Sequence, residues 1–247
     1  YNNLMKYIIS IILIFNISGV NANEIFNLLK IPNLEIYNIN SSNGLKYLYA
    51  ENNFKIGLKK NISCDRSKKN ELDKKYPIIE KNLNKYESDF LIKNNLKFII
   101  LCENLSISSI NTGGVPNILT RSLILDINFN LEHFERMIHH EFFHMIQAKH
   151  NKVFDETLWS KFNKASFKYA DCSTCSDRTD LSLYRNTDGF LTEYSKSIPS
   201  EDMAEIFSFL MTNRKLVENI IESDLILKNK VNYLKNNLKL IDNNFVF

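Results

Sequence analysis

The first half of the chain alternates short apolar segments with polar breaks. Apolar segments at Ile31–Ile39, Leu45–Ala50 and Phe54–Leu58 are separated by Asn, Ser and Gly residues, a pattern that predicts strands and turns. Leu96–Leu101 is apolar apart from Lys97 and contains β-branched residues, which predicts a buried strand, and Leu119–Ile127 predicts a second strand. Residues 111–116, Asn-Thr-Gly-Gly-Val-Pro, predict a turn between these two strands.

Elsewhere the apolar residues recur at helical spacing. This spacing predicts helices over Tyr76–Asn94, over about Leu131–Lys149 with Asn130 as N-cap, over Ser200–Thr212 with Ser200 as N-cap, and one or two over Leu216–Leu240. Residues 170–190 lack periodicity and predict a loop. The order of elements predicts an α+β fold with a small mixed sheet. We expect one domain over 23–247, with an N-terminal α/β part (23–150) and a mainly helical C-terminal part (151–247).

The N-terminal segment has the pattern of a secretory signal peptide. Lys6 precedes a short apolar run that ends at Val20-Asn21-Ala22, with a small residue at the expected cut after Ala22. An uncleaved anchor is the alternative, but the run contains Asn16 and is shorter than the roughly 20 residues that span a bilayer. We therefore predict that residues 1–22 are removed, and that the protein is exported, periplasmic or secreted, without a stable membrane span.

Composition and cysteine usage fit an exported globular protein. Apolar residues make up 44% of the chain, which is ample for a core. Lys and Arg number 31 against 28 Asp and Glu, with no basic stripe, so nucleic acid is not an expected partner. The four cysteines predict disulfides. The sequence favours a Cys172–Cys175 loop staple and a Cys64–Cys102 bridge, although four cysteines permit three pairings.

The strongest chemical signal is an HExxH motif, His140-Glu141-Phe142-Phe143-His144, inside the helix predicted over 131–149. Residues four apart lie on one face of a helix, so two imidazoles can bind one zinc ion while Glu141 acts on a metal-bound water. All five histidines of the chain lie between positions 133 and 150, which packing alone does not explain. This pattern predicts a zinc-dependent peptidase that acts on protein or peptide substrates.

Catalytic zinc needs a third protein ligand, and the sequence offers two candidates. His150 stands ten residues after His140, but Gln147-Ala148-Lys149 favour a continuing helix that carries His150 away from the metal. Glu201 and Glu205 share one face of a second, mostly apolar helix. One of them can bind zinc while the other orients a ligating histidine. A solvated acidic helix start is the alternative, but the apolar neighbours predict burial, and buried carboxylates need partners.

These motifs in this order carry a family resemblance that spans roughly residues 131–212. His140-Glu-Phe-Phe-His144, then Gly189-Phe-Leu-Thr-Glu-Tyr194, then Glu201-Asp-Met-Ala-Glu205 resembles the bacterial family named "putative zinc-binding metallopeptidases". It is similar, more distantly, to the catalytic domains of anthrax lethal factor and the Pro-Pro endopeptidases. The resemblance implies a zincin-like fold of the gluzincin type, with Glu201 as third ligand, Glu205 behind the ligands, and Tyr194 as a stabiliser of the oxyanion. Residues 23–130 add no recognisable motif.

The residues and the resemblance together predict amide hydrolysis, with Glu141 as general base and zinc as cofactor. We expect the strand Leu119–Ile127 to be the sheet edge that pairs with extended substrate. One alternative is a zincin-fold protein that binds zinc and a partner with little or no proteolysis, but such a protein has no need of Glu141. Another is redox work by the CxxC at Cys172, whose sequence surroundings give no reason for a depressed thiol pKa.

Overall fold

The computed structural model describes residues 34–57 and 59–247. The signal peptide predicted over residues 1–22 lies outside the described residues. The strands are β1 (Leu34–Asn38), β2 (Lys46–Ala50), β3 (Phe54–Ile56), β4 (Ile62–Asp65), β5 (Phe98–Ile107), β6 (Ile110–Asn111), β7 (Gly114–Asn117) and β8 (Ser122–Asp126). The helices are α2 (Lys69–Leu83), α3 (Ser88–Lys93), α4 (Phe134–Lys149), α5 (Glu156–Ser160), the 3₁₀ turn η1 (Tyr194–Lys196), α6 (Pro199–Ile220) and α7 (Leu225–Ile241). The protein is a mixed α+β structure, as the sequence predicts.

The sheet curls around the long strand β5. The first half of β5, Phe98–Cys102, pairs in parallel with both β2 and β8, while its second half pairs antiparallel with β4 and β6. Strand β7 pairs antiparallel with β8 alone and therefore forms one edge of the sheet. β8 is buried along its whole length, because it lies between β5 and β7.

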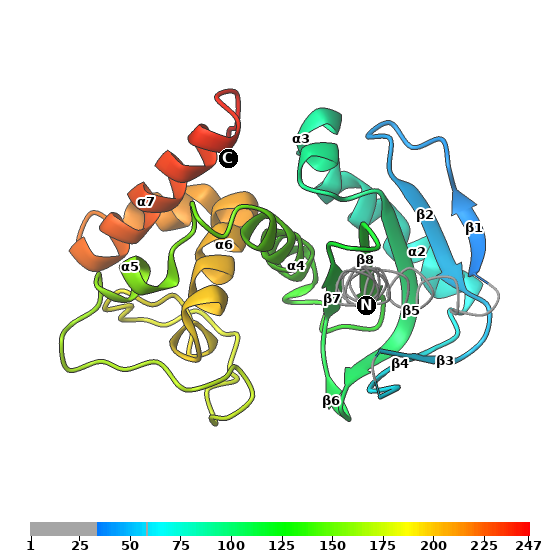
Figure 1. Ribbon diagram of the computed structural model, residues 1–247, viewed down its shortest axis with the longest axis horizontal. Helices are drawn as coiled ribbons and strands as arrows, with labels where there is room; N and C mark the ends of the chain where they lie inside the picture. The colour runs from blue at the N-terminus through cyan, green and yellow to red at the C-terminus, as the bar shows by residue number, and fades with distance from the viewer. Residues whose placement is uncertain (1–33, 58) are drawn as a thin grey trace, which may run out of the picture.

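Helix α4 joins the two halves of the molecule. In Figure 1 it lies between the sheet, together with α2 and α3, and the C-terminal helices α5, α6 and α7, and it packs directly on α6, β7 and α2. Its buried positions include Phe134, Ile138, Phe142 and Met145, which recur at helical spacing. The main core forms around this helix, so the residues that α4 carries are held from both sides.

Several predicted boundaries are wrong for physical reasons. The segment Tyr76–Asn94 forms two helices rather than one, because the chain turns between α2 and α3 and buries the Tyr86 ring against Phe142. Helix α4 begins at Phe134 after His133, and Asn130 instead accepts a hydrogen bond from the Glu132 N–H in the preceding turn.

Helix α6 also begins earlier than predicted, at Pro199 after the N-cap Ile198, so Ser200 lies inside the helix. Proline suits the first helical position because its fixed φ is helical and the N–H that it lacks would have no partner there. The helix then continues to Ile220 through a kink at Asn213. It therefore takes in the first part of the segment Leu216–Leu240, and α7 forms the rest.

The predicted edge strand needs correction. Leu119–Ile127 contains β8, which is interior, whereas the edge strand β7 lies in the segment that the sequence predicts as a turn. Gly113, Gly114 and Pro116 are typical turn residues, but pairing with β8 extends them. Pro116 is compatible with an edge strand because its missing N–H need not serve a ladder.

Two disulfides join the four cysteines, and free cysteines are absent from the described residues. Cys64–Cys102 joins the neighbouring strands β4 and β5, and Cys172–Cys175 closes a short turn in the long loop before η1. Both pairings are as predicted, and they are compatible with an exported protein. Within the described residues, no helix combines the length and apolarity that a membrane span requires.

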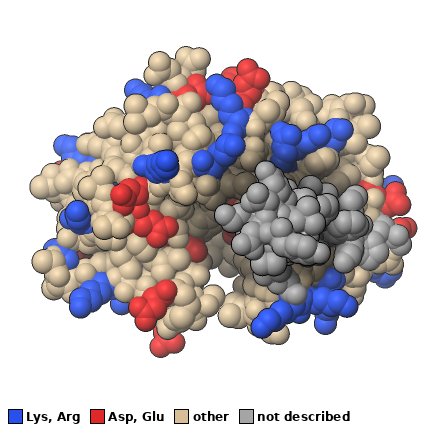
Figure 2. All heavy atoms as spheres, in the orientation of Figure 1, with Lys and Arg blue, Asp and Glu red and all other residues tan. Residues whose placement is uncertain are grey.

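Charged side chains are mixed on the visible surface. On the face drawn in Figure 2, Lys and Arg side chains occur on both halves of the molecule, and Asp and Glu side chains lie among them. The expectation that nucleic acid is not a partner stays a prediction.

Candidate metal centre and active site

Helix α4 presents His140 and His144 one turn apart on its cleft side. Their ring centroids are 4.9 Å apart, and their Nε2 atoms are separated by 3.2 Å. The neighbouring His139 points the other way and is fully buried, where it hydrogen-bonds the Tyr86 hydroxyl and Asn82. His139 is therefore a core residue rather than the surface or site-lining group that its position beside the motif suggests.

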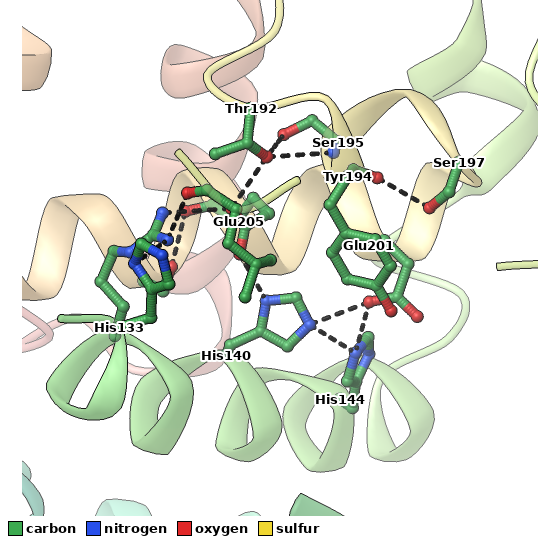
Figure 3. Close-up of polar contacts among 12 residues, drawn as sticks. His133, His140, His144, Thr192, Tyr194, Ser195, Ser197, Glu201 and Glu205 are labelled. Atoms are coloured by element: carbon green, nitrogen blue, oxygen red, sulfur yellow. Dashed lines mark hydrogen bonds and ion pairs between the residues drawn. The ribbon is translucent and has the colours of Figure 1, made fainter. Parts of the chain in front are cut away.

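Helix α6 brings a carboxylate to the two imidazoles. Glu201 Oε2 lies 2.8 Å from His140 Nε2 and 3.2 Å from His144 Nε2, so the three atoms form a small triangle (Figure 3). Glu201 is 61 residues away from His140 in the sequence, and the packing of α6 against α4 closes that distance. Burial by itself lowers the pKa of His140, but Glu201 and Glu205 raise it to about 10.

Behind the triangle, Glu205 fixes the orientation of His140. His140 Nδ1 donates to Glu205 Oε1 at 3.0 Å, which leaves Nε2 directed at Glu201 and His144. Glu205 Oε2 accepts from Arg136 Nη1 at 3.1 Å and from the Thr192 hydroxyl at 2.9 Å. Burial acts to raise the pKa of Glu205, but these hydrogen bonds and positive charges lower it below its usual value. The carboxylate is thus held ionised although it is only 2% exposed.

Glu141 lines the cleft and packs against the edge strand β7. A Cβ atom placed on Gly114 would lie 2.6 Å from Glu141 Cγ, so the strand packs on this side chain as closely as glycine allows. Glu141 is half-buried overall, but desolvation of its carboxylate is the largest influence and raises its pKa to about 7. The positive charges of His140 and His144 act in the opposite direction. A carboxylate with this pKa is suited to proton transfer near neutral pH.

Tyr194 enters the site from η1, the short turn before α6. Its ring stacks on His140 at a centroid separation of 5.9 Å, and Figure 3 shows it beside Glu201 and above His144. The pKa of the Tyr194 phenol is raised above its usual value. Burial is the largest cause, and the negative charges of Glu201 and Glu141 add to it. The hydroxyl therefore keeps its proton at neutral pH and can act as a hydrogen-bond donor.

The six site residues that the sequence predicts lie around one hollow, whereas His150, the other candidate for the third ligand, lies elsewhere. A hollow between the sheet and the helices is lined by His140, Glu141, His144, Tyr194, Glu201 and Glu205. His150 lies at the end of α4 instead, where its Nε2 hydrogen-bonds the side chain of Asn94.

The protein atoms suit a zinc ion. The ligand atoms of His140, His144 and Glu201 all lie within 4.8 Å of one another, and two nitrogens with one oxygen form a typical zinc donor set. Tetrahedral zinc with bonds of about 2.0–2.1 Å places its ligand atoms roughly 3.3 Å apart, close to the separations observed here. Three protein ligands leave a fourth position for water or substrate, which is the arrangement of catalytic rather than structural zinc sites.

The sequence also matches a family. Residues 109–243 match the family model described as "Putative zinc-binding metallo-peptidase". The chain belongs to this family. The match covers α4, η1 and α6, and so every residue of the candidate site lies within it. The solved structures similar to it include a putative zinc-binding metallo-peptidase from Bacteroides caccae ATCC 43185, at 23% identity and a TM-score of 0.48. That similarity covers 68% of this chain and 70% of the other. Among curated proteins, none matches it.

Two members of the site escaped the sequence reasoning. Arg136 stands four residues before His140, on the same side of α4, and this spacing is a signal that could have drawn attention to it. Gly114 carries no comparable signal, because only the packing of β7 on Glu141 makes the missing side chain necessary.

Proposed function

We propose that this protein is an exported zinc-dependent peptidase of the gluzincin type with a zincin-like fold. In this proposal His140, His144 and Glu201 hold the metal. The observation that carries it is the triangle of His140 Nε2, His144 Nε2 and Glu201 Oε2, with sides of 2.8, 3.2 and 3.2 Å. Membership of a family named for zinc binding and peptidase activity supports the same reading.

The chain's own residues would divide the chemistry among them. Bound zinc supplies Lewis acidity that activates a water molecule and polarises the scissile carbonyl. Glu141 accepts the proton of the attacking water and passes it to the leaving amine. Tyr194 donates a hydrogen bond to the developing oxyanion, an interaction typically worth about 3 kcal/mol. Glu205 holds His140 in the tautomer that leaves Nε2 free to bind.

The wider placement of the protein is part of the same proposal. We infer that residues 1–22 are cleaved as a signal peptide and that 23–247 form one catalytic domain with an α/β part and a helical part. The two disulfides support an oxidising compartment. The distant similarity to lethal factor and the Pro-Pro endopeptidases rests on the HExxH, Tyr194 and Glu201–Glu205 pattern. N-terminal sequencing of the exported protein tests the cleavage, and a start other than Asn23 would contradict it.

A direct test combines metal content with peptide mapping. We expect wild type and Glu141→Gln to bind one zinc per chain, whereas His144→Ala loses it. In a diverse peptide library, mass spectrometry should detect cuts by zinc-loaded wild type that fall about 10²- to 10⁴-fold in Glu141→Gln, the usual contribution of a general base. Full zinc loading with no cuts at all would reject the peptidase and favour partner binding.

A further inference from the structure

The long loop before η1 forms part of the rim of the cleft. Ser173 and Thr174 line the hollow of about 640 Å³ that also contains the candidate metal site and Tyr194. These two residues lie inside the turn that the Cys172–Cys175 bridge closes. One of the two disulfides therefore lies at the cleft itself. Residues 170–181, which carry this bridge, are called the rim loop below.

Backbone hydrogen bonds fasten the rim loop to η1 on both sides of the bridge. Before the bridge, the Ala170 N–H donates to the Ser197 carbonyl at 2.7 Å. The Ser197 hydroxyl in turn donates to the Tyr194 carbonyl at 2.7 Å (Figure 3). After the bridge, the Tyr194 N–H donates to the Asp180 carbonyl at 3.0 Å. The peptide groups on both sides of Tyr194 are thus tied to the rim loop.

Arg178 adds a third fastening between the rim loop and η1. Its Nη1 donates to the carbonyl of Lys196 in η1 and, at 3.3 Å, to the carbonyl of Lys168 just before the rim loop. Its guanidinium also lies over the Phe167 ring, 5.6 Å from the centroid. Arg178 therefore joins both ends of the rim loop to the turn that carries Tyr194.

The placement of Tyr194 should be sensitive to these fastenings. η1 has only 3 residues, so it has little hydrogen bonding of its own to fix the turn. It also packs on α6, so we expect it to shift rather than unfold when the rim loop is released. Opening the covalent closure of a loop raises its conformational entropy. A displacement of about 1 Å in a group that acts on the reacting atoms can lower a rate roughly 100-fold.

The two disulfides differ in their access to solvent. Cys175 is exposed, whereas Cys64 and Cys102 are only 2% and 0% exposed. Thiol–disulfide exchange requires that an attacking thiolate reach a sulfur atom. A dithiol reductant can therefore open the Cys172–Cys175 bridge while Cys64–Cys102 stays closed.

The exchange is balanced and reversible. One thiolate of the reductant attacks Cys175 Sγ, and the S–S bond breaks with its electron pair going to Cys172 Sγ, which takes up a proton. The second thiolate of the reductant then displaces Cys175 Sγ, which also becomes a thiol, and the reductant leaves as a cyclic disulfide. The oxidised form of the reductant reverses both steps.

We propose that the Cys172–Cys175 bridge is a redox-sensitive positioning element for Tyr194. With the bridge closed, the rim loop holds η1 so that the Tyr194 hydroxyl reaches the oxyanion. With the bridge open, turnover is slower, but zinc stays bound because the three candidate ligands lie on α4 and α6. This inference rests on the proposed zinc peptidase function and adds a control of the same site: the peptidase is fast in an oxidising compartment and slow in a reducing one.

Replacing both cysteines tests the positioning role. Cys172→Ser combined with Cys175→Ser should lower kcat about tenfold, a loss within the range for a misplaced group, and leave the zinc content unchanged. In a Tyr194→Phe background the same replacement should lower kcat by less than about twofold, because the interaction that it disturbs is already gone. Arg178→Ala should also lower kcat, with the bridge intact. Arg185→Ala changes an exposed arginine of the same long loop, and this matched control should behave as wild type.

Reduction of the intact enzyme tests the redox control. Zinc-loaded wild type is treated with dithiothreitol, the reductant is removed under anaerobic conditions, and thiols, zinc and kcat are measured. We expect two new thiols, unchanged zinc and a kcat about tenfold lower that recovers on reoxidation. The variant with both serines should not respond to the same treatment. This control separates the rim bridge from Cys64–Cys102 and from any removal of zinc by the reductant.

The outcomes separate this inference from the function on which it rests. A kcat left unchanged by reduction, by the cysteine replacement or by Arg178→Ala would overturn the inference and leave a zinc peptidase in place. Loss of zinc on reduction, or an equal loss of kcat in the Tyr194→Phe background, would do the same, since the bridge would then support the site as a whole. An oxidised, zinc-loaded wild type that cuts no peptide overturns the peptidase and this inference together.

Discussion

The two walls of the cleft are built by different means. On the sheet side, β8 buries Leu123 and Leu125 completely, and its polar backbone groups are paired in the ladders with β5 and β7. On the helical side, α6 buries three acidic side chains of its first turns, Glu201, Asp202 and Glu205. The sheet wall is therefore held by apolar packing and main-chain hydrogen bonds, while the helical wall depends on partners for buried charges.

Each buried carboxylate of α6 has polar partners. Glu201 contacts His140 and His144, and Glu205 contacts His140 and Arg136. Asp202 faces away from the cleft and receives hydrogen bonds from Lys230, Trp159 and Tyr169. Removing one partner of a buried ion pair leaves an uncompensated charge, whereas removing an apolar group leaves a cavity. Substitutions in the two walls should consequently destabilise the protein for different reasons: an unpaired buried charge in the helical wall and a cavity in the sheet wall.

The largest effect is expected from Lys230→Met. Lys230 and Asp202 are both fully buried, with 2.7 Å between Nζ and Oδ2. The variant should lose about 3–5 kcal/mol in free energy of unfolding, measured in urea, because Asp202 remains buried without its cation. The double variant with Asp202→Asn should recover much of this loss. A loss below about 1 kcal/mol in the single variant would mean that the helical wall does not depend on this pair.

One disulfide lies on the sheet side of the molecule and the other on the helical side. Cys64–Cys102 spans 38 residues within the sheet half, and Cys172–Cys175 spans 3 residues in the loop that lines the cleft. Loop-closure entropy predicts losses of about 4 and about 1.6 kcal/mol when each pair is replaced by serine. Thermal unfolding of the two double variants checks the order. Equal losses would show that strain or residual structure, rather than loop length, sets the contribution.

Glu205→Gln tests the link between a buried charge and the metal. Without the carboxylate, His140 loses its charged acceptor, and zinc affinity should fall about 10- to 100-fold. Competition with a chromophoric chelator measures this. Thr192→Val removes a neutral donor to the same carboxylate and should have a smaller effect. An unchanged zinc affinity in Glu205→Gln would contradict the positioning role.

Gly114→Ala tests the sheet wall. The added methyl group would collide with Glu141 and shift it, and kcat should fall about 10- to 100-fold, as misplacements near 1 Å can cause. Zinc content and the urea midpoint should stay close to wild type, because the metal triangle and the core are untouched. An activity loss that merely parallels a loss of stability would mean that the strand, and not Glu141, is disturbed.

The smallest effect concerns the loop before η1. Asp224 caps α7 by accepting from the Leu227 N–H, and it also accepts from Thr187 and Gly189. Burial acts to raise its pKa, but these hydrogen bonds lower it below the ordinary value of 3.8. Folding thus favours the carboxylate form, and its contribution is present above pH 4 and is lost as the pH falls through the folded pKa.

Asp224→Ala should therefore cost about 1 kcal/mol at pH 7, the usual value of an N-cap. The difference from wild type should shrink as the pH drops below 3.8. Denaturant curves at several pH values check the direction. A difference that grows toward low pH would contradict it.

What the sequence predicts well is local. The HExxH spacing places His140 and His144 on one face of a helix because i and i+4 are neighbours there, whatever the rest of the chain does. Most of the predicted strand Leu96–Leu101 lies in β5, which begins at Phe98, for a similar reason, since its continuous apolar part needs cover on both faces.

What the sequence misses is non-local. Gly-Gly-Val-Pro has the composition of a turn, and only its pairing with β8 makes it the strand β7. The meeting of His140 with Glu201 depends on how α4 packs against α6, which no spacing rule supplies; the family resemblance, not the periodicity, pointed to Glu201. Arg136 gains its role from Glu205, 69 residues away in the sequence.

Pro116 has a consequence for how copies of the protein meet one another. An edge strand with open backbone groups can also recruit the edge of a second molecule, and this is a common route to aggregation. β7 is only four residues long, and Pro116 offers an acceptor but no donor on the open side. Two copies of the strand therefore cannot pair along a full ladder. The residue that makes this segment resemble a turn thereby disfavours pairing of this edge with a second molecule.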